Sequence, residues 1–211
     1  SWDDVWNGRA FRGGGQGLRI EAMPGSQVQR YMASLTEPYL FDTNISLTLS
    51  GYYFDRRYDD WDEQRLGGRV GLGYRLTPDL SVSAAVRGEN VNIHDPRILV
   101  PDLAEAVGDN SLFSGRFTVA HDTRDTPFFP TEGHYIELGY EQTFGSFDYP
   151  RFNAELRKYF LLNERPDGSG RHTMAYSFRV GMSGDEQPIY ENYFAGGFST
   201  MRGFDFRGAS P

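Results

Sequence analysis

A regular alternation of apolar and polar side chains is the feature that most constrains the fold of this sequence. In RLGGRVGLGYRLT, residues 65–77, Leu66 and Leu72 fall on one face of an extended chain, while Arg65 and Arg69 fall on the other. A strand places successive side chains on opposite faces, whereas a helix would mix these two sets. The alternation therefore predicts β-strands with one apolar face and one charged face.

The same period of two recurs along the chain and predicts nine strands, mostly ten to thirteen residues long. Strands of soluble proteins have about 5–6 residues, so these are long. Short links such as LTPD, residues 76–79, indicate antiparallel hairpins. The segments lie near residues 14–23, 28–37, 43–54, 65–77, 80–90, 111–120, 133–144, 151–160 and 172–181.

Long antiparallel strands with one apolar face fit two architectures. One is a soluble sheet with a wet outer face, and the other is a transmembrane up-and-down β-barrel with a polar lumen. Aromatic residues cluster at strand ends, as in the aromatic girdles of membrane barrels, although packing at the edge of a soluble core would give a similar pattern. The pattern favours the membrane barrel. The pairs are Tyr39 and Phe41, Tyr53 and Phe54, Phe128 and Phe129, Phe144 and Phe147, and Tyr159 and Phe160.

Composition excludes several classes of protein and site. The chain has no cysteine, which rules out disulfides, thiolate catalysis and cysteine zinc sites. A net charge of -8 argues against a nucleic-acid partner. No apolar run reaches the length of a transmembrane helix, and the four histidines are scattered without the spacing of metal ligands.

The segment DTRDTPFFPTEG, residues 122–133, is dense in turn-forming residues. Its carboxylates resemble a catalytic set, but aspartates in turns commonly accept hydrogen bonds from nearby backbone amides. We therefore interpret the segment as a turn. The residues that define it are Asp122, Arg124, Asp125, Pro130 and Gly133.

A second motif lies in YENYFAGGFSTMRGFDFRG, residues 190–208. A guanidinium group has five donors in a fixed fork and keeps its charge, so it suits docking against an acidic wall. Glycines let the backbone turn sharply beside that wall, and a phenylalanine supplies an apolar anchor. The alternative is a flexible glycine-rich linker. The candidate docking residues are Met201, Arg202, Gly203 and Phe204, supported by Gly196 and Gly197.

These two motifs, in this order, resemble the barrel domain of the BamA-type family, the insertases of outer-membrane proteins. The second motif resembles the family's sixth extracellular loop, with Met201 where the family more often has Val or Leu. The family has sixteen strands preceded by periplasmic POTRA domains. The resemblance thus implies that residues 1–211 form a partial barrel of about nine strands that ends within this loop. The POTRA domains, the terminal strands and the partners of Arg202 are then expected outside this chain, and the fragment is not expected to be stable by itself.

The resemblance also implies a function in the bacterial outer membrane, namely the assembly and insertion of β-barrel proteins without covalent chemistry. Expected partners are unfolded outer-membrane proteins, assembly lipoproteins and membrane lipids, and no cofactor, metal or nucleic acid is expected. Four alternatives remain, namely a TamA-type assembly protein, a protein-secretion pore, a porin-like channel and a soluble carbohydrate-binding sandwich.

Charged residues of the polar strand faces are expected to line the lumen, where they form interstrand ion pairs and a place for the loop to dock. They are Arg65, Arg69, Arg75, Arg116, Arg157 and Arg179, with Glu137, Glu141 and Glu155.

Overall fold

A computed structural model describes residues 15–98, 100–167 and 170–194 of the chain. They form one antiparallel sheet of nine strands in sequence order, each joined to the next by a hairpin connection. The strands are β1 (Gly17–Met23), β2 (Val28–Glu37), β3 (Ile45–Arg57), β4 (Asp62–Arg75), β5 (Leu80–His94), β6 (Gly108–Asp122), β7 (Gly133–Gly145), β8 (Tyr149–Glu164) and β9 (Arg171–Ser183). The sequence-based prediction of nine antiparallel strands is confirmed.

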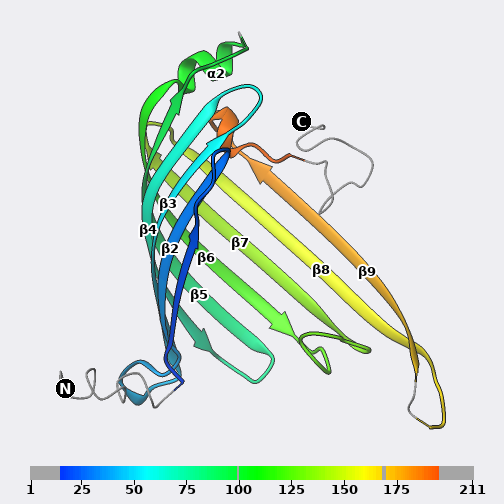
Figure 1. The fold of residues 1–211 in the computed structure, drawn as a ribbon. Helices are drawn as coiled ribbons and strands as arrows, with labels where there is room; N and C mark the ends of the chain where they lie inside the picture. The colour runs from blue at the N-terminus through cyan, green and yellow to red at the C-terminus, as the bar shows by residue number, and fades with distance from the viewer. Residues whose placement is uncertain (1–14, 99, 168–169, 195–211) are drawn as a thin grey trace.

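The sheet curves like part of a barrel wall and is not closed (Figure 1). Within the described residues, β1 pairs only with β2 and β9 only with β8, so these two strands are the edges. One end of the sheet carries a 3-10 turn, η1 (Leu40–Asp42), and three further connections. The opposite end carries a short helix, α2 (Pro101–Ala106), and a second 3-10 turn, η2 (Ile189–Glu191).

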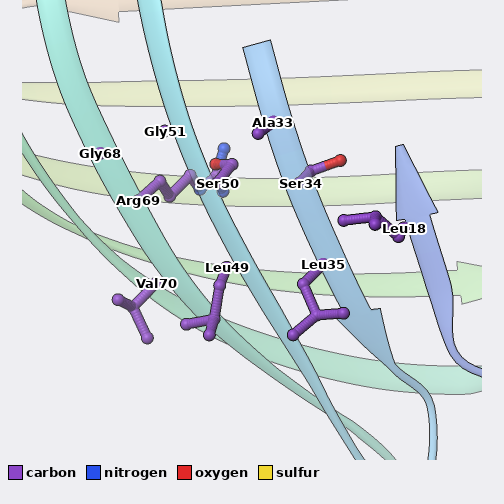
Figure 2. Close-up of a pocket in the computed structure, with 10 residues that line it drawn as sticks. All are labelled: Leu18, Ala33, Ser34, Leu35, Leu49, Ser50, Gly51, Gly68, Arg69 and Val70. Atoms are coloured by element: carbon purple, nitrogen blue, oxygen red, sulfur yellow. The ribbon is translucent and has the colours of Figure 1, made fainter. Parts of the chain in front are cut away.

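The strand register sorts the side chains into two faces. Leu35, Leu49 and Val70 are register partners across β2, β3 and β4, and they form one apolar row. Figure 2 shows this row beside the next one, which holds Ser50 and Arg69. The apolar face leaves many large side chains exposed, including Phe117 at 50% and Phe178 at 63%. A face of this kind suits lipid, because contiguous exposed apolar patches are small on soluble monomers.

The opposite face is polar along most of its length and is the concave one. Side chains stand roughly perpendicular to a sheet, so those of distant strands converge only on the concave side. Arg65 of β4 and Arg151 of β8 both contact Glu191 of η2, which places this face on the inside of the curve.

A small apolar core covers the concave face at the end that carries α2 and η2. Pro101 begins α2 at a position where its missing N–H costs nothing, and the helix then buries Leu103 and Ala106. The buried members of this core are Trp61, Val91, Ile93, Leu103, Ala106, Leu112 and Tyr190. In the part of the chain that the structure describes, no helix has the length and apolarity needed to cross a bilayer.

The two faces predict opposite responses to an added charge. In the full-length protein, Leu49→Arg on the apolar face should destabilise the barrel, by up to about 2–4 kcal/mol if the residue lies near the bilayer midplane. Thr48→Arg, one residue earlier, places the same charge on the polar concave face and should change stability much less. Urea unfolding of the protein refolded in lipid vesicles measures the difference. Equal destabilisation by both variants would contradict the assignment of the faces.

Candidate functional site

The first half of the 122–133 turn is fixed by an ion pair between close neighbours. The Nε and Nη2 atoms of Arg124 each donate to a different carboxylate oxygen of Asp122, both at 2.8 Å. The Arg124 guanidinium also lies 5.0 Å from the ring centre of Tyr135 on β7. Such a two-point pair holds the guanidinium in one orientation.

The second half of the turn is closed by Asp125. Its Oδ1 accepts from the backbone N–H of Thr131 at 2.9 Å and of Glu132 at 3.3 Å, and its Oδ2 accepts from the Thr131 hydroxyl at 2.6 Å. Pro130 directly precedes these donors and has no N–H of its own. Both aspartates are therefore occupied in holding the turn, which supports the turn interpretation over a catalytic set.

Glycine is required at position 133, where the turn enters β7. Gly133 has φ of +98°, and a Cβ there would lie 2.2 Å from the carbonyl oxygen of Thr123. The turn presents Phe128 and Phe129 at its tip, with exposures of 88% and 89%. The five predicted motif residues thus lie together in one tightly bonded turn at the end of the sheet opposite α2.

The second predicted motif cannot be placed in the same way. Gly196, Gly197, Met201, Arg202, Gly203 and Phe204 lie outside the described residues. The structure does describe the start of the same segment, residues 184–194, which we call the loop root. It leaves β9 and enters the concave face, so its contacts define the site.

The concave wall beneath the loop root carries a network of buried charges. Arg65 lies 2.5 Å from Glu63 and 3.6 Å from Glu89, while Arg87 lies 2.9 Å from Glu89 and 3.3 Å from Glu141. These pairs link β4, β5 and β7. Ion pairs that are shielded from water are screened by salt much less than surface pairs, so the network is a durable feature of the wall.

Tyr52 extends this network across a glycine. The hydroxyl end of its side chain lies over Gly67, where a Cβ would come within 2.7 Å of the hydroxyl oxygen, and this hydroxyl donates to Glu89 at 2.6 Å. Tyr52, Gly67 and Glu89 are register partners on β3, β4 and β5. A glycine at position 67 is thus what lets the tyrosine reach the network.

The loop root docks on this wall through Tyr190, Glu191 and Tyr193. The carboxylate of Glu191 contacts Arg65 at 2.5 Å and Arg151 at 3.1 Å. The backbone carbonyl oxygen of Glu191 also accepts a hydrogen bond from Arg151 Nη2 at 2.6 Å. Burial by itself would raise the pKa of Glu191, but the charges of Arg65, Arg87 and Arg151 outweigh it and lower the pKa, so the carboxylate stays ionised.

Two tyrosines complete the docking. Tyr190 is buried in the apolar core, and its carbonyl oxygen accepts from Arg65 Nη2 at 3.2 Å. Tyr193 donates to Asn153 Oδ1 on β8 at 2.7 Å, and its ring fills the space over Gly181 on β9. The loop root therefore touches several strands of the wall.

The predicted lumen charges all face the concave side, but they differ in their partners. Arg116 lies 3.6 Å from Glu137, and Arg157 and Arg179 both pair with Glu155. Within the described residues, Arg69 and Arg75 make no ion pair. Three residues of the site, Arg151, Tyr190 and Glu191, were not predicted as docking residues, although Tyr190 and Glu191 begin the 190–208 segment. The alternation in β8 would have placed Arg151 on the polar face with Asn153 and Glu155.

One group in the described part of the chain has the composition of a metal site. Ligand atoms of Asp62, His94 and Asp95 lie within 4.8 Å of one another. Asp62 is already engaged by Arg97 at 2.7 Å and by Arg57 at 3.6 Å. Because these arginines supply the positive charge that an ion would bring, the group gives no argument for a metal.

The turn geometry predicts a graded effect of substitutions at Asp125. Asp125→Ala removes three hydrogen bonds and should speed chymotrypsin cleavage after Phe128 several-fold in the folded full-length protein, whereas the bond after Phe129 resists cleavage because Pro130 follows it. Asp125→Asn keeps Oδ1 and places an amide where Oδ2 bonds Thr131, so it should cleave at close to the wild-type rate. Equal cleavage of wild type and Asp125→Ala would contradict the assignment of Asp125 as the residue that closes the turn.

The same hydrogen bonds predict how the turn responds to acid. The Thr131 hydroxyl and the N–H groups of Thr131 and Glu132 lower the pKa of Asp125 to about 2, against about 3.9 in an unfolded chain. A lowered pKa means that the stabilisation is complete above about pH 5, begins to fall near the unfolded-state pKa and is lost as the pH falls through about 2, where the folded-state carboxylate takes up its proton. Amide exchange at Thr131 and Glu132, corrected for the intrinsic pH dependence, should therefore stay protected at pH 4 and lose protection near pH 2. Loss already at pH 5 would contradict this.

Three comparisons with known proteins agree with the fold. Residues 10–211 match the Omp85 superfamily domain. The outer membrane protein assembly factor BamA of Nitratidesulfovibrio vulgaris is 26% identical over 219 residues, which cover 96% of this chain and 26% of that protein. The crystal structure of BamA from Haemophilus ducreyi lacking POTRA domains 1–3 superposes with a TM-score of 0.76 at 16% identity, over 94% of this chain and 42% of that one.

This chain therefore spans about a quarter of the length of the curated relative that it matches. The predicted resemblance, the fold class and the outer-membrane location are confirmed by these matches. The open nine-stranded sheet has the strand arrangement of part of a larger barrel. The chain belongs to the Omp85 superfamily, and its sheet is part of an outer-membrane β-barrel.

Proposed function

We propose that the protein containing this chain folds and inserts β-barrel proteins into the bacterial outer membrane, without covalent chemistry. Its curated relative carries the name of an outer-membrane protein assembly factor. The observation that carries the proposal is the loop root, which enters the concave face and docks there through Glu191 and its neighbours. An insertase of this family uses a loop held inside its barrel, whereas a diffusion channel needs an open lumen.

The alternatives fit the structure less well. A porin-like channel leaves a wide aqueous path, but here α2 and the loop root build a buried core over one end of the concave face. A soluble sandwich would cover its apolar face with a second sheet, and the described residues form a single sheet. A TamA-type assembly protein or a secretion pore would share the docked loop, so these remain the second candidates.

The motif residues receive specific positions in this proposal. Residues 1–211 form a partial barrel domain, with POTRA modules and terminal strands in other parts of the protein. The 122–133 turn lies on the periplasmic side. Met201, Arg202, Gly203 and Phe204, with Gly196 and Gly197, continue the docked loop on the extracellular side, and Arg202 pairs with strands outside this chain.

The proposed partners follow from the same arrangement. Unfolded outer-membrane proteins add their strands to an open barrel edge by β-augmentation, because an edge strand presents unpaired N–H and C=O groups. Membrane lipids contact the apolar outer face, and assembly lipoproteins act from the periplasm. A cofactor and a nucleic acid are not part of the proposal.

The experiment compares wild-type full-length protein with Arg202→Ala and Arg202→Lys in outer membranes. Arg202→Ala removes the docking charge and should cost about 1.5–3 kcal/mol of barrel stability, as for other hydrogen bonds to charged groups. Arg202→Lys keeps the charge but loses the fork, so its loss should be smaller. Heat-modifiable gel mobility reports barrel stability, and the yield of a folded reporter porin reports assembly.

The outcomes separate the candidates. Loss of reporter assembly together with loss of barrel stability in Arg202→Ala supports the insertase. Normal stability and normal reporter assembly would show that the tail motif is an ordinary loop, and a porin-like channel would then replace the insertase. Loss of barrel stability with normal reporter assembly would favour the secretion pore, which shares the docked loop. Ion conductance of the purified full-length protein in planar bilayers would identify the channel.

A further inference from the structure

Beyond the six predicted docking residues, the strongest feature is the position of Glu191, where side chains of three strands converge. Its carboxylate lies 2.5 Å from Arg65 on β4, 4.0 Å from Arg87 on β5 and 3.1 Å from Arg151 on β8. The Glu191 side chain is 6% exposed. A carboxylate that is so deeply buried stays charged at a tolerable free-energy cost only while its cationic partners are in place.

The contacts of Glu191 reach across the curve of the sheet. Strands β4 and β8 are four positions apart, which is about 19 Å along a sheet with strands ~4.8 Å apart. Side chains on a flat sheet run parallel, so Arg65 and Arg151 meet one carboxylate only while the sheet is curved. Docking of Glu191 is therefore coupled to the curvature between these strands.

The wall is arranged so that this contact can be released. When Glu191 leaves, Arg65 keeps Glu63 and Glu89. Arg87 keeps Glu89 and Glu141. Two of the three cations thus stay paired, which lowers the free-energy cost of undocking, since a buried charge without a partner is strongly destabilising.

Arg151 differs from the other two arginines. Within the described residues its ion pair is with Glu191, and its guanidinium also lies 5.7 Å from the ring centre of Tyr149 and 5.3 Å from that of Tyr193. Arg151 Nη2 contacts both the carboxylate and the carbonyl oxygen of Glu191. The ion pair of Arg151 therefore depends on docking of the loop root. Arg65 and Arg87 also pair with glutamates of the wall, so their ion pairs do not.

We propose that Glu191 is a releasable latch, a positioning residue that seats the loop root on the concave wall and ties the curvature of β4 to β8 to the docked state of the loop. The proposal deepens the proposed function, since the seated loop root leads directly into the segment that carries Arg202. Release of the latch frees the loop root from the wall and relaxes the curve of the sheet.

The test measures the position of the loop root directly. The chain has no cysteine, and Asn192, next to the latch, makes no side-chain hydrogen bond within the described residues. An Asn192→Cys reporter in an otherwise cysteine-free full-length protein is labelled with a membrane-impermeant maleimide in outer membranes. The labelling rate is compared among wild type, Glu191→Gln, Glu191→Asp and Glu186→Gln.

Glu186 provides the matched control, because it lies in the same loop root, is exposed and loses the same charge on substitution. We expect Glu191→Gln to raise the labelling rate about tenfold or more, Glu191→Asp to bring it back towards wild type, and Glu186→Gln to leave it unchanged. Equal labelling of Glu191→Gln and Glu186→Gln, both with folded barrels by heat-modifiable mobility, would overturn the latch.

A second variant keeps the test decisive if Glu191→Gln fails to fold. Arg151→Gln leaves Glu191 paired with Arg65 and removes the partner that depends on docking, so labelling should rise by a smaller factor, and an unchanged rate would overturn the latch. Unchanged labelling would contradict the latch proposal, whereas normal reporter assembly in Arg202→Ala would contradict the insertase proposal, so the two failures are distinguishable.

Discussion

The structure depends on one constraint, which is that a backbone facing lipid must satisfy its N–H and C=O groups within the protein. The nine strands meet it by pairing each with the next in antiparallel register. Once the pairing is set, the period of two assigns every side chain to a face. Leu49 and Val70 then face the lipid side, while Ser50 and Arg69 face the concave side. The membrane-facing surface and the charged wall are thus two consequences of the same backbone requirement.

The concave wall is under a different constraint, because it holds charged side chains where water is partly excluded. Arginines and glutamates from neighbouring strands neutralise one another, and Tyr52 crosses Gly67 to bond Glu89. The loop root adds one further carboxylate, Glu191, to a wall that already contains most of the partners its arginines need. In the proposed latch, this balance lowers the free-energy cost of releasing Glu191 from the wall, because Arg65 and Arg87 keep other carboxylate partners.

The strands and their faces could be predicted from the sequence because alternation is a local property. The predicted hairpin between residues 65–77 and 80–90, for instance, is β4 paired with β5. The 122–133 turn was equally readable, since the partners of Asp125 lie only six and seven residues away. Glu191 escaped prediction because Arg65, one of its partners, lies 126 residues away, and no local pattern links the two. The burial of the short helix at Pro101–Ala106 over β5 and β6 likewise has no local signal in the sequence.

The sequence by itself determined that this chain forms a long-stranded antiparallel sheet with one apolar face, because side-chain period and turn residues act over a few positions. It also identified the family through two motifs. Only the tertiary structure decided which charges meet. The convergence of Arg65, Arg87 and Arg151 on Glu191 requires a curved sheet and a loop that folds back into it. Curvature and loop docking arise from contacts between residues far apart in the sequence, and these become visible only when the strands are placed side by side.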